Sequence, residues 1–310
     1  MPPFPKPAGK TLSRAKPARQ QGLSPKPRLN GAMACDTAFR IVARRHLDAL
    51  TANREATAGG DPTALHQMRI ALTHLRTAIL FFSPMVEDAI RDEVRDELKW
   101  LNGELGAVRD LDVAVDRIKG LNKKRQVLPA VGAWNEKRNE GHRTLSRMLH
   151  SVRYQWLIDQ TSGWIENGPW STKRDKPSET ERAKPIGDYT TAKLLEWEKT
   201  LLRRSRNLRK MGTKKRHRLR LLNKKLTYSI DSFEDLFGDK NFAKQKAALK
   251  QLRRAQRSLG QLNDGARGEA LAEELKRGGV TTEVRFLKKK QEKRLLKKAT
   301  KAYRKLDKVK

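Results

Sequence analysis

A basic signature occurs twice in this chain, at residues 65–82 and 216–233, and it constrains the fold more than any other sequence feature. The two copies read LHQMRIALTHLRTAILFF and RHRLRLLNKKLTYSIDSF. Each has a histidine, a basic residue three positions later, and a polar or basic pair seven and eight positions later. These residues are His66, Arg69, Thr73 and His74 in the first copy, and His217, Arg220, Lys224 and Lys225 in the second.

A second pair of matching segments follows the signature. Leu98-Lys99 and residues 105–110 match Leu252-Arg253 and residues 259–264. Two elements in the same order at nearly the same spacing predict an internal duplication. We therefore expect two similar halves related by a pseudo-two-fold axis, with their equivalent basic surfaces brought together.

Hydrophobic periodicity predicts an all-α fold, because apolar residues recur at helical spacing and no period-2 run of β-branched residues indicates a strand. The first helix is expected to begin near Met33 and to end before a break at 53–62. The other expected helices span 62–82, 86–105, 110–119, 126–159, 189–210, 213–237, 241–260, 265–277 and 281–307. Asp61 and Pro62 mark a helix start as N-cap and first-turn residues.

The chain divides into an arm and one duplicated domain. Residues 1–30 are rich in proline, lysine and arginine and contain no acid, so they are expected to form a disordered basic arm. The domain covers 31–310, with helical halves over 33–165 and 189–310. Between them, 166–188 reads as a polar, turn-rich linker. Each multi-helix half is expected to form a helical bundle.

In the first signature helix a basic stripe lies beside the buried face. Leu65, Met68, Leu72, Leu75, Ile79 and Phe82 form an apolar stripe. His66, Arg69, Thr73 and Arg76 each follow by one residue, which is a rotation of about 100°. This position presents basic groups on the wall of a groove between helices; the alternative is that they lie along the bundle edge and pair with carboxylates.

The second copy repeats the offset with three departures. Arg216, Asn223 and Thr227 stand where the first copy has Leu65, Leu72 and Arg76. Neither His66 nor His217 has a His, Cys or carboxylate four residues later that would indicate metal binding. Each is expected to hydrogen-bond within the bundle or to assist anion binding rather than to act as a catalytic base.

The matched segment at 105–110 permits two structural interpretations. Gly106 is a plausible helix C-cap, and Asp110 is either an N-cap or an orienting partner for a neighbouring arginine. Asp264 is the equivalent of Asp110 in the second copy. We expect both acids to have mainly structural roles.

The net charge of +34, from 69 Lys and Arg against 35 Asp and Glu, points to a polyanionic partner. Self-repulsion on this scale destabilises a compact state unless salt or a polyanion neutralises it. Nucleic acid, inorganic polyphosphate and an anionic membrane are candidates, and a merely solvated basic surface is the alternative.

No stretch is apolar enough to span a membrane, and residues 1–30 lack the apolar core of a secretory signal. With Cys35 as the single cysteine, a reducing, cytoplasmic location is expected.

These motifs resemble the CHAD family, the conserved-histidine α-helical domain. The matching strings are HQMRIALTHLR with ELKWLNGELGAVRDLDV, and HRLRLLNKKLTY with LRRAQRSLGQLND, and the resemblance covers about 33–310. It implies two helical bundles related by pseudo-two-fold symmetry, with a basic central surface that binds inorganic polyphosphate. Family members are found in prokaryotic cytoplasm, some of them on polyphosphate granules.

The resemblance implies a set of polyphosphate-binding positions that come from both halves. They are His66, Arg69, Arg76, Lys99, Arg109, His217, Arg220, Lys224, Lys225 and Arg253. The chain departs from the family at Thr73 and Thr227, where a basic residue is usual, and at His74, where arginine is usual. Because of these departures, the expected site has fewer basic side chains than the family pattern.

Three classes of function can be compared. Non-enzymatic binding of inorganic polyphosphate is the leading hypothesis, because closely spaced phosphates suit dense arginine and lysine. Sequence-nonspecific nucleic-acid binding is the alternative: the arm and the basic C-terminal helix suit backbone contacts, but no nucleic-acid-binding motif occurs and aromatic residues do not interleave with the basic stripes. An enzyme acting on phosphoanhydrides is disfavoured because no P-loop, nucleophile elbow or metal-binding pair of carboxylates is present. We expect no cofactor and no metal.

Overall fold

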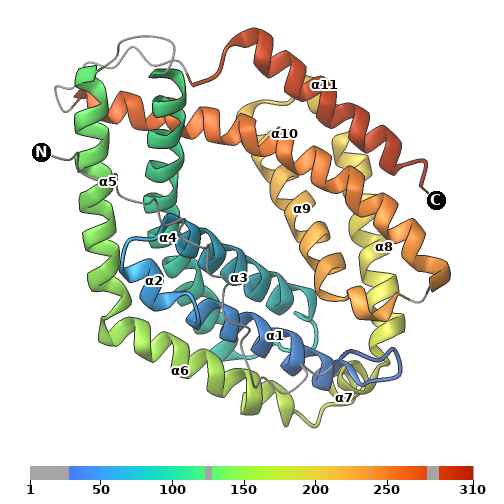
Figure 1. Cartoon of the computed structure of the whole chain (residues 1–310). Helices are drawn as coiled ribbons and strands as arrows, with labels where there is room; N and C mark the ends of the chain where they lie inside the picture. The colour runs from blue at the N-terminus through green and yellow to red at the C-terminus, as the bar shows by residue number, and fades with distance from the viewer. Residues whose placement is uncertain (1–27, 123–127, 238, 278–285, 310) are drawn as a thin grey trace, which may run out of the picture.

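The fold is entirely α-helical across the residues that the computed structural model describes, namely 28–122, 128–237, 239–277 and 286–309. No strand occurs in these ranges, where a single bridge joins Ala34 and Pro185. The prediction of an all-α fold is confirmed. The α-helices, drawn in Figure 1, are α1 Cys35–Thr51, α2 Arg54–Ala58, α3 Pro62–Phe81, α4 Ala89–Asn122, α5 Leu128–Leu149, α6 Val152–Asn167, α7 Lys176–Ala183, α8 Ile186–Ser205, α9 Thr213–Ser232, α10 Asp239–Arg277 and α11 Lys289–Leu306.

Four helices in each half contact one another in a closed ring. In the first half α1 contacts α3, α3 contacts α4, α4 contacts α6, and α6 returns to α1. In the second half the same order runs through α8, α9, α10 and α11. Helices α2 and α5 are additions to the first half and contact each other. The matched order is what a duplication would produce, although the duplication itself stays a prediction from the sequence.

The signature helices lie where the two halves meet. Helix α3 contacts α9, and α4 contacts α10 (Figure 1). Aromatic side chains pack across the junction: the ring centroids of Phe81 and Phe233 are 4.7 Å apart, and those of Phe82 and Tyr189 are 5.6 Å apart. This continuous apolar contact fixes α3 against α9, and with it the relative position of their basic stripes.

A second, smaller core lies where the far end of α10 reaches the first half. With 39 residues, α10 is about 58 Å long, enough to extend from the second half to α4 and α5. The cluster consists of Leu111, Ala114, Val115, Ile118, Trp134, Ala272 and Phe286. Trp134 and Phe286 lie 5.8 Å apart between ring centroids. The end of α10 is therefore anchored on the first half by its own apolar contact.

Helix starts follow the local chemistry of the chain. Asp61 caps α3 by accepting a hydrogen bond from the Thr63 amide (2.7 Å), with Pro62 in the first turn, as the sequence predicts. The expected helix over 126–159 is instead two helices, because Ser151 caps α6 by accepting from the Tyr154 amide (3.3 Å). Within the expected linker, Asp175 caps α7 by accepting from the Ser178 amide (2.9 Å).

Two expected interruptions are wrong. Helix α4 runs unbroken through Gly106 and Asp110, and α10 runs unbroken through the equivalent segment at 259–264. Gly106 is not a C-cap but a buried glycine in the middle of α4, beside the Arg69 side chain. Asp110 is not an N-cap but pairs with Arg267 on α10 (2.9 Å), which is the orienting role that the sequence left open.

Other expectations fall at or beyond the edges of the described ranges. The basic arm lies outside them up to residue 27, while Leu29 is buried in the main core. Cys35 is buried and free, and burial raises the pKa of its thiol to about 12. None of the described helices combines the length and the apolar character needed to cross a membrane.

Candidate anion-binding site

Basic side chains from α3, α4 and α9 come together where the two halves meet. We call five of them the central cluster: His66, Arg69, Arg109, Arg220 and Lys224. They lie close enough for their charges to act on one another. Burial and then the charges of Arg109, Arg69 and Lys224 lower the pKa of His66, and burial and then those of Arg220 and Arg69 lower the pKa of Lys224. The structure therefore brings the paired arginines of the two signature copies, Arg69 and Arg220, together in one cluster.

The Arg69 guanidinium lies against the neighbouring helix α4 beside Gly106. Its Nη2 atom lies 3.7 Å from the point that a Cβ on Gly106 would occupy. This is an ordinary van der Waals distance, so the guanidinium packs directly against α4 at Gly106. Burial lowers the pKa of Arg69 below its ordinary value; among the neighbouring charges Asp110 opposes this, while Arg109 and Arg220 add to it.

Arg109 is positioned by a buried polar network between α4 and α5. Its Nη1 atom donates to the Pro62 carbonyl (3.4 Å) and lies 3.9 Å from Asp112 Oδ2. Asp112 is 1 % exposed and accepts hydrogen bonds from Arg138 and His142, both at 2.8 Å. These bonds hold the pKa of Asp112 below its ordinary value against the opposing effect of burial. The ionised Asp112 thus fixes the position of one arginine of the cluster.

The two signature histidines have different environments. The geometry of His217 fits a hydrogen bond from Nδ1 to Asn263 Oδ1 (3.0 Å), since an amide oxygen can only accept. His66 is exposed and makes no hydrogen bond to any described residue. Desolvation and then the positive charges of Arg109, Arg69 and Lys224 lower the pKa of His66. His66 is therefore a neutral group at neutral pH whose protonation a bound anion would favour.

Arg220 has a buried hydrogen-bond donor that is available to a ligand. Its Nε atom is buried and has no hydrogen-bond partner among the residues that the structure describes. Leaving a buried donor unpaired is costly, and the cost is larger for a charged group than for a neutral one. Lys224 lies beside it, with its Nζ atom 5.3 Å from the ring centroid of Tyr228. Burial, followed by the charges of Arg220 and Arg69, lowers the pKa of Lys224 to about 8.

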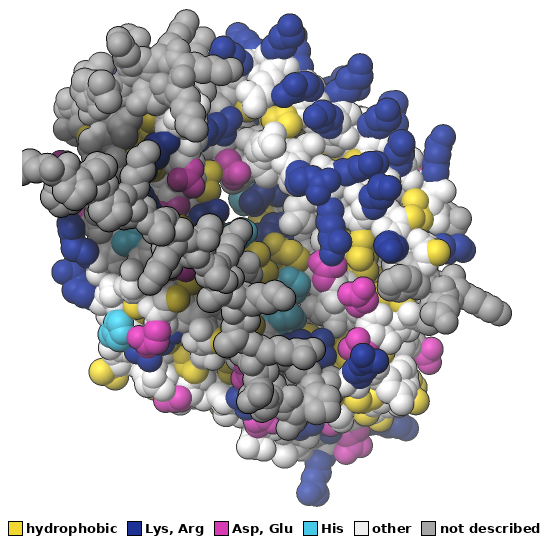
Figure 2. Space-filling view, in the orientation of Figure 1, with side chains coloured by type: hydrophobic (Ala, Val, Ile, Leu, Met, Phe, Trp, Pro, Cys, Tyr) yellow, Lys and Arg dark blue, Asp and Glu magenta, His cyan; other side chains and the backbone are white. Residues whose placement is uncertain are grey.

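Two carboxylates border the central cluster. Asp110 and Asp264 are partly buried and occupy equivalent positions in α4 and α10. Burial raises the pKa of Asp264, while the nearby charge of Arg220 opposes that rise. Among the described residues neither acid forms an ion pair within 4.0 Å with a member of the cluster; Asp110 pairs with Arg267 instead. The cluster therefore keeps a net positive charge. Figure 2 shows basic, acidic and histidine side chains around the hollow in the middle of this face.

A second group of cations lies on one side of the α3–α9 contact. We call Arg76, Arg95, Arg204 and Lys225 the flank cluster; they come from α3, α4, α8 and α9. Burial and then Arg76, Arg204 and Arg95 lower the pKa of Lys225. Arg95 pairs with Asp92 (3.0 Å), but Arg76, Arg204 and Lys225 form no ion pair with a described residue. Of the ten predicted positions, the structure therefore places five in the central cluster and two, Arg76 and Lys225, in the flank cluster.

Three predicted positions, His217, Lys99 and Arg253, belong to neither cluster. Lys99 and Arg253 are exposed on α4 and α10, each ten residues before the position matched by Arg109 and Asn263, about 15 Å along the helix. Arg253 pairs with Asp231 on α9 (2.7 Å). Their part in anion binding stays a prediction from the sequence.

The sequence missed Arg95 and Arg204. Neither belongs to a repeated motif, and the position equivalent to Arg95 in the second copy is Leu249. Only the packing of α4 and α8 beside Lys225 brings them to the site. No signal in a single sequence identifies them.

The departures at Thr73, Thr227 and His74 have local structural explanations. The two threonine hydroxyls donate to the carbonyls of Arg69 and Asn223, each at 2.8 Å, so these side chains turn toward their own helices. The His74 ring stacks on Tyr228 with centroids 4.2 Å apart. Burial and the charge of Lys224 lower the pKa of His74 to about 4. His74 is therefore uncharged at neutral pH and adds no positive charge to the site.

The arrangement can bind anions through several fixed donors. Its chemistry is that of guanidinium, ammonium and imidazole groups around a partly buried surface. Among the described residues no group of three or more His, Cys, Asp or Glu side chains has the geometry to hold a metal ion.

Comparisons with known proteins agree with this fold. A family model described as CHAD domain matches residues 41–273. A crystal structure of the CHAD domain from the plant Ricinus communis has a TM-score of 0.72 and 23% identity, covering 91% of this chain and 95% of that chain. PptA from Streptomyces chartreusis has a TM-score of 0.53 and 13% identity, covering 89% of this chain and 96% of that chain. No curated protein matches the sequence.

Proposed function

The chain belongs to the CHAD domain family, and we propose that it binds inorganic polyphosphate through the central cluster without catalysing a reaction. The ligand class comes from the resemblance between the signature motifs and that family. The observation that carries the proposal is the convergence of Arg69 and Arg220 from the two signature copies, with the buried Nε of Arg220 unpaired.

The chemistry of the cluster suits a chain of phosphates. Guanidinium groups bind phosphate oxygens through two parallel hydrogen bonds, and these charge-assisted bonds are roughly twice as strong as neutral ones. Polyphosphate carries closely spaced charges and no bases, so it needs dense cations rather than stacking surfaces. The flank cluster, with Arg76 on the same stripe of α3 as Arg69, supplies further cations for a chain that extends beyond the centre.

The direct test measures the affinity of the full chain for long-chain polyphosphate at near-physiological salt. We expect Arg69→Ala/Arg220→Ala to weaken binding at least tenfold, because it removes both paired guanidinium groups. The control Lys297→Ala/Lys301→Ala removes the same charge from two exposed positions on α11 and should change the affinity less than twofold. Equal losses in the two double variants would show that binding depends on overall charge and would contradict the proposal.

Sequence-nonspecific nucleic-acid binding is the second candidate, and α11 is the observation that favours it. Its nine Lys and Arg side chains at 289, 290, 293, 294, 297, 298, 301, 304 and 305 are all exposed. In Figure 2 this edge of the molecule is covered by Lys and Arg side chains. Such a row suits a phosphate backbone, whatever its bases.

The absence of catalysis and the cellular location are part of the proposal. Incubation of the protein with polyphosphate and magnesium or manganese should release no phosphate above the uncatalysed rate; release that Arg69→Ala/Arg220→Ala abolishes would make the protein an enzyme. We propose a cytoplasmic location on polyphosphate granules, which fluorescence microscopy of the tagged full chain tests against a granule stain.

A further inference from the structure

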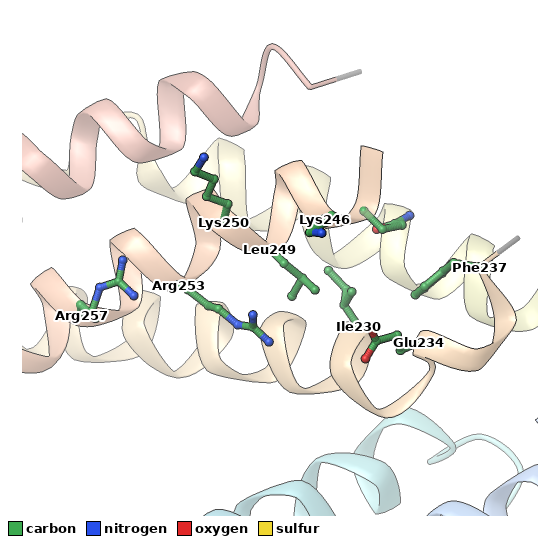
Figure 3. Close-up of a pocket in the computed structure, with 9 residues that line it drawn as sticks. Ile230, Glu234, Phe237, Lys246, Leu249, Lys250, Arg253 and Arg257 are labelled. Atoms are coloured by element: carbon green, nitrogen blue, oxygen red, sulfur yellow. The ribbon is translucent and has the colours of Figure 1, made fainter. Parts of the chain in front are cut away.

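A cavity separate from the central cluster lies between the end of α9 and the first half of α10 (Figure 3). Its volume is about 430 Å³, within the range of small-molecule sites. It is lined by Ile230, Glu234, Phe237, Gln245, Lys246, Leu249, Lys250, Arg253 and Arg257.

The cavity joins an apolar surface to a basic wall. Ile230, Phe237 and Leu249 supply the apolar part, and Figure 3 shows Leu249 and Arg253 extending from α10 toward α9. The basic residues recur at three- and four-residue spacing and so form one stripe of α10: Lys246, Lys250, Arg253 and Arg257.

The positive charge of this wall is only partly compensated. Asp231 pairs with Arg253 at 2.7 Å, and Glu234 is the acid in the lining. Lys250 and Arg257 form no ion pair with any described residue. A guanidinium held by one carboxylate keeps further N–H groups for a ligand, so Arg253 can pair with Asp231 and still donate to an anion.

The first half matches this wall at one position only, where Lys99 corresponds to Arg253. With Leu98 matched to Leu252, the positions of Lys246, Lys250 and Arg257 are occupied in α4 by Asp92, Asp96 and Gly103. The apolar Leu249 is matched by Arg95. The combination of apolar and basic residues that lines the cavity is therefore specific to the second half, and of its basic residues only Arg253 belongs to the repeated segments.

We propose that this cavity binds a small amphipathic organic anion, with an apolar body against Ile230, Leu249 and Phe237 and a phosphate or carboxylate group on Arg253 and Arg257. This goes beyond the proposed function, because inorganic polyphosphate has no apolar part and gains nothing from the apolar wall. A ligand that has both parts gains from the burial of its apolar body in addition to its bonds with the guanidinium groups.

Isothermal titration of the full chain with n-octyl phosphate tests the proposal. Inorganic phosphate in tenfold excess suppresses binding at sites that recognise phosphate alone. We expect one saturable site for octyl phosphate under these conditions. Arg253→Gln/Arg257→Gln should weaken it at least tenfold, whereas Arg294→Gln/Lys297→Gln, which removes the same charge from exposed positions on α11, should change it less than twofold.

Two further variants separate this site from the central cluster. Leu249→Ser should also weaken octyl phosphate binding, because it removes part of the apolar wall, and its melting curve reports whether the fold persists. Arg69→Ala/Arg220→Ala should leave octyl phosphate binding unchanged. No saturable binding by the wild type, or an equal loss in the α10 and α11 pairs, would overturn the proposal whatever the outcome for polyphosphate.

Discussion

At the scale of single residues, the central cluster holds buried positive charges close together, which is unfavourable in the free protein. Lys224 is largely buried beside Arg220 and Arg69 and has a pKa of about 8, against 10.5 for an ordinary lysine. That difference corresponds to a cost on the order of 3 kcal/mol for the charged form at neutral pH. A bound polyanion would relieve this cost. The buried charge of Lys224 therefore lowers the stability of the free protein and stabilises the complex.

Replacing Lys224 should therefore separate stability from binding. Lys224→Met keeps an unbranched apolar chain beside Tyr228 and removes the buried charge. We expect its free energy of unfolding at pH 7 to rise by about 1–3 kcal/mol, while its affinity for polyphosphate falls. Thermal unfolding and a binding titration measure the two effects. The same substitution at the exposed Lys297 should change neither; a Lys224→Met variant that is less stable than wild type would contradict the account.

The pKa of Lys224 also predicts how binding depends on pH. Because this base has a lowered pKa of about 8, it loses its charge between pH 7 and 9 in the free protein, and polyphosphate affinity should fall over that interval. A bound anion raises the pKa, so the complex takes up protons there. In Lys224→Arg the charge persists and the fall should largely disappear, whereas Lys297→Arg should behave as wild type. An identical pH dependence in all three proteins would exclude Lys224 as the titrating group.

The sequence predicted part of this site, for definite physical reasons. The paired positions of Arg69 and Arg220 follow from the repeat, because a stripe one residue from the buried face must lie beside a neighbouring helix. The charge states of His74 and Lys224 depend on burial and neighbours, which the sequence does not contain. Arg95 and Arg204 come from helices outside the signature, so only the packed structure brings them to Lys225.

At the scale of helices, glycines in α10 have opposite packing environments. A Cβ on Gly268 would lie 2.6 Å from Cγ of Phe286, inside contact distance of a rigid ring, whereas a Cβ on Gly260 would meet no atom within 4 Å. Gly268 therefore permits the close contact that anchors α10 in the second core. Gly260 has no such packing role in the described structure.

A matched pair of alanine variants tests this difference. Gly268→Ala should lower the free energy of unfolding by about 1–3 kcal/mol through overpacking. Gly260→Ala should raise it by up to about 1 kcal/mol through its better helix propensity. Denaturant unfolding measures both, and hydrogen exchange at 265–277 should be faster in Gly268→Ala alone. Equal effects of the two substitutions would show that the contact with Phe286 has no energetic weight.

Sequence patterns could not predict where some helices end, nor what the residues do at which the second copy differs from the first. The breaks expected at Gly106 and at its counterpart Gly260 are absent, because α4 and α10 continue through both glycines. Two departures of the second copy make bonds to α11. Arg216 pairs with Glu292 (2.6 Å), and Asn223 accepts from the Tyr303 hydroxyl (3.1 Å). The second copy thus uses polar positions to hold its fourth helix.

At the scale of the whole molecule, the two four-helix rings set the central cluster at their junction. The charge of +34 acts against compaction, while aromatic contacts between Phe81, Phe82, Phe233 and Tyr189 join the halves. Composition predicted a polyanionic partner at this scale. It could not distinguish a local site from a basic surface spread over the molecule, because that distinction depends on which cations lie together.

The central claim is that a specific pair of arginines at this junction selects polyphosphate over other polyanions. The most direct measurement is a competition between long-chain polyphosphate and a DNA duplex of equal phosphate concentration at near-physiological salt, for the wild type and Arg69→Ala/Arg220→Ala. The account predicts that polyphosphate displaces DNA from the wild type and that the double variant loses this preference. Equal competition by both polymers, unchanged in the variant, would contradict the claim and favour nucleic-acid binding by the basic surface.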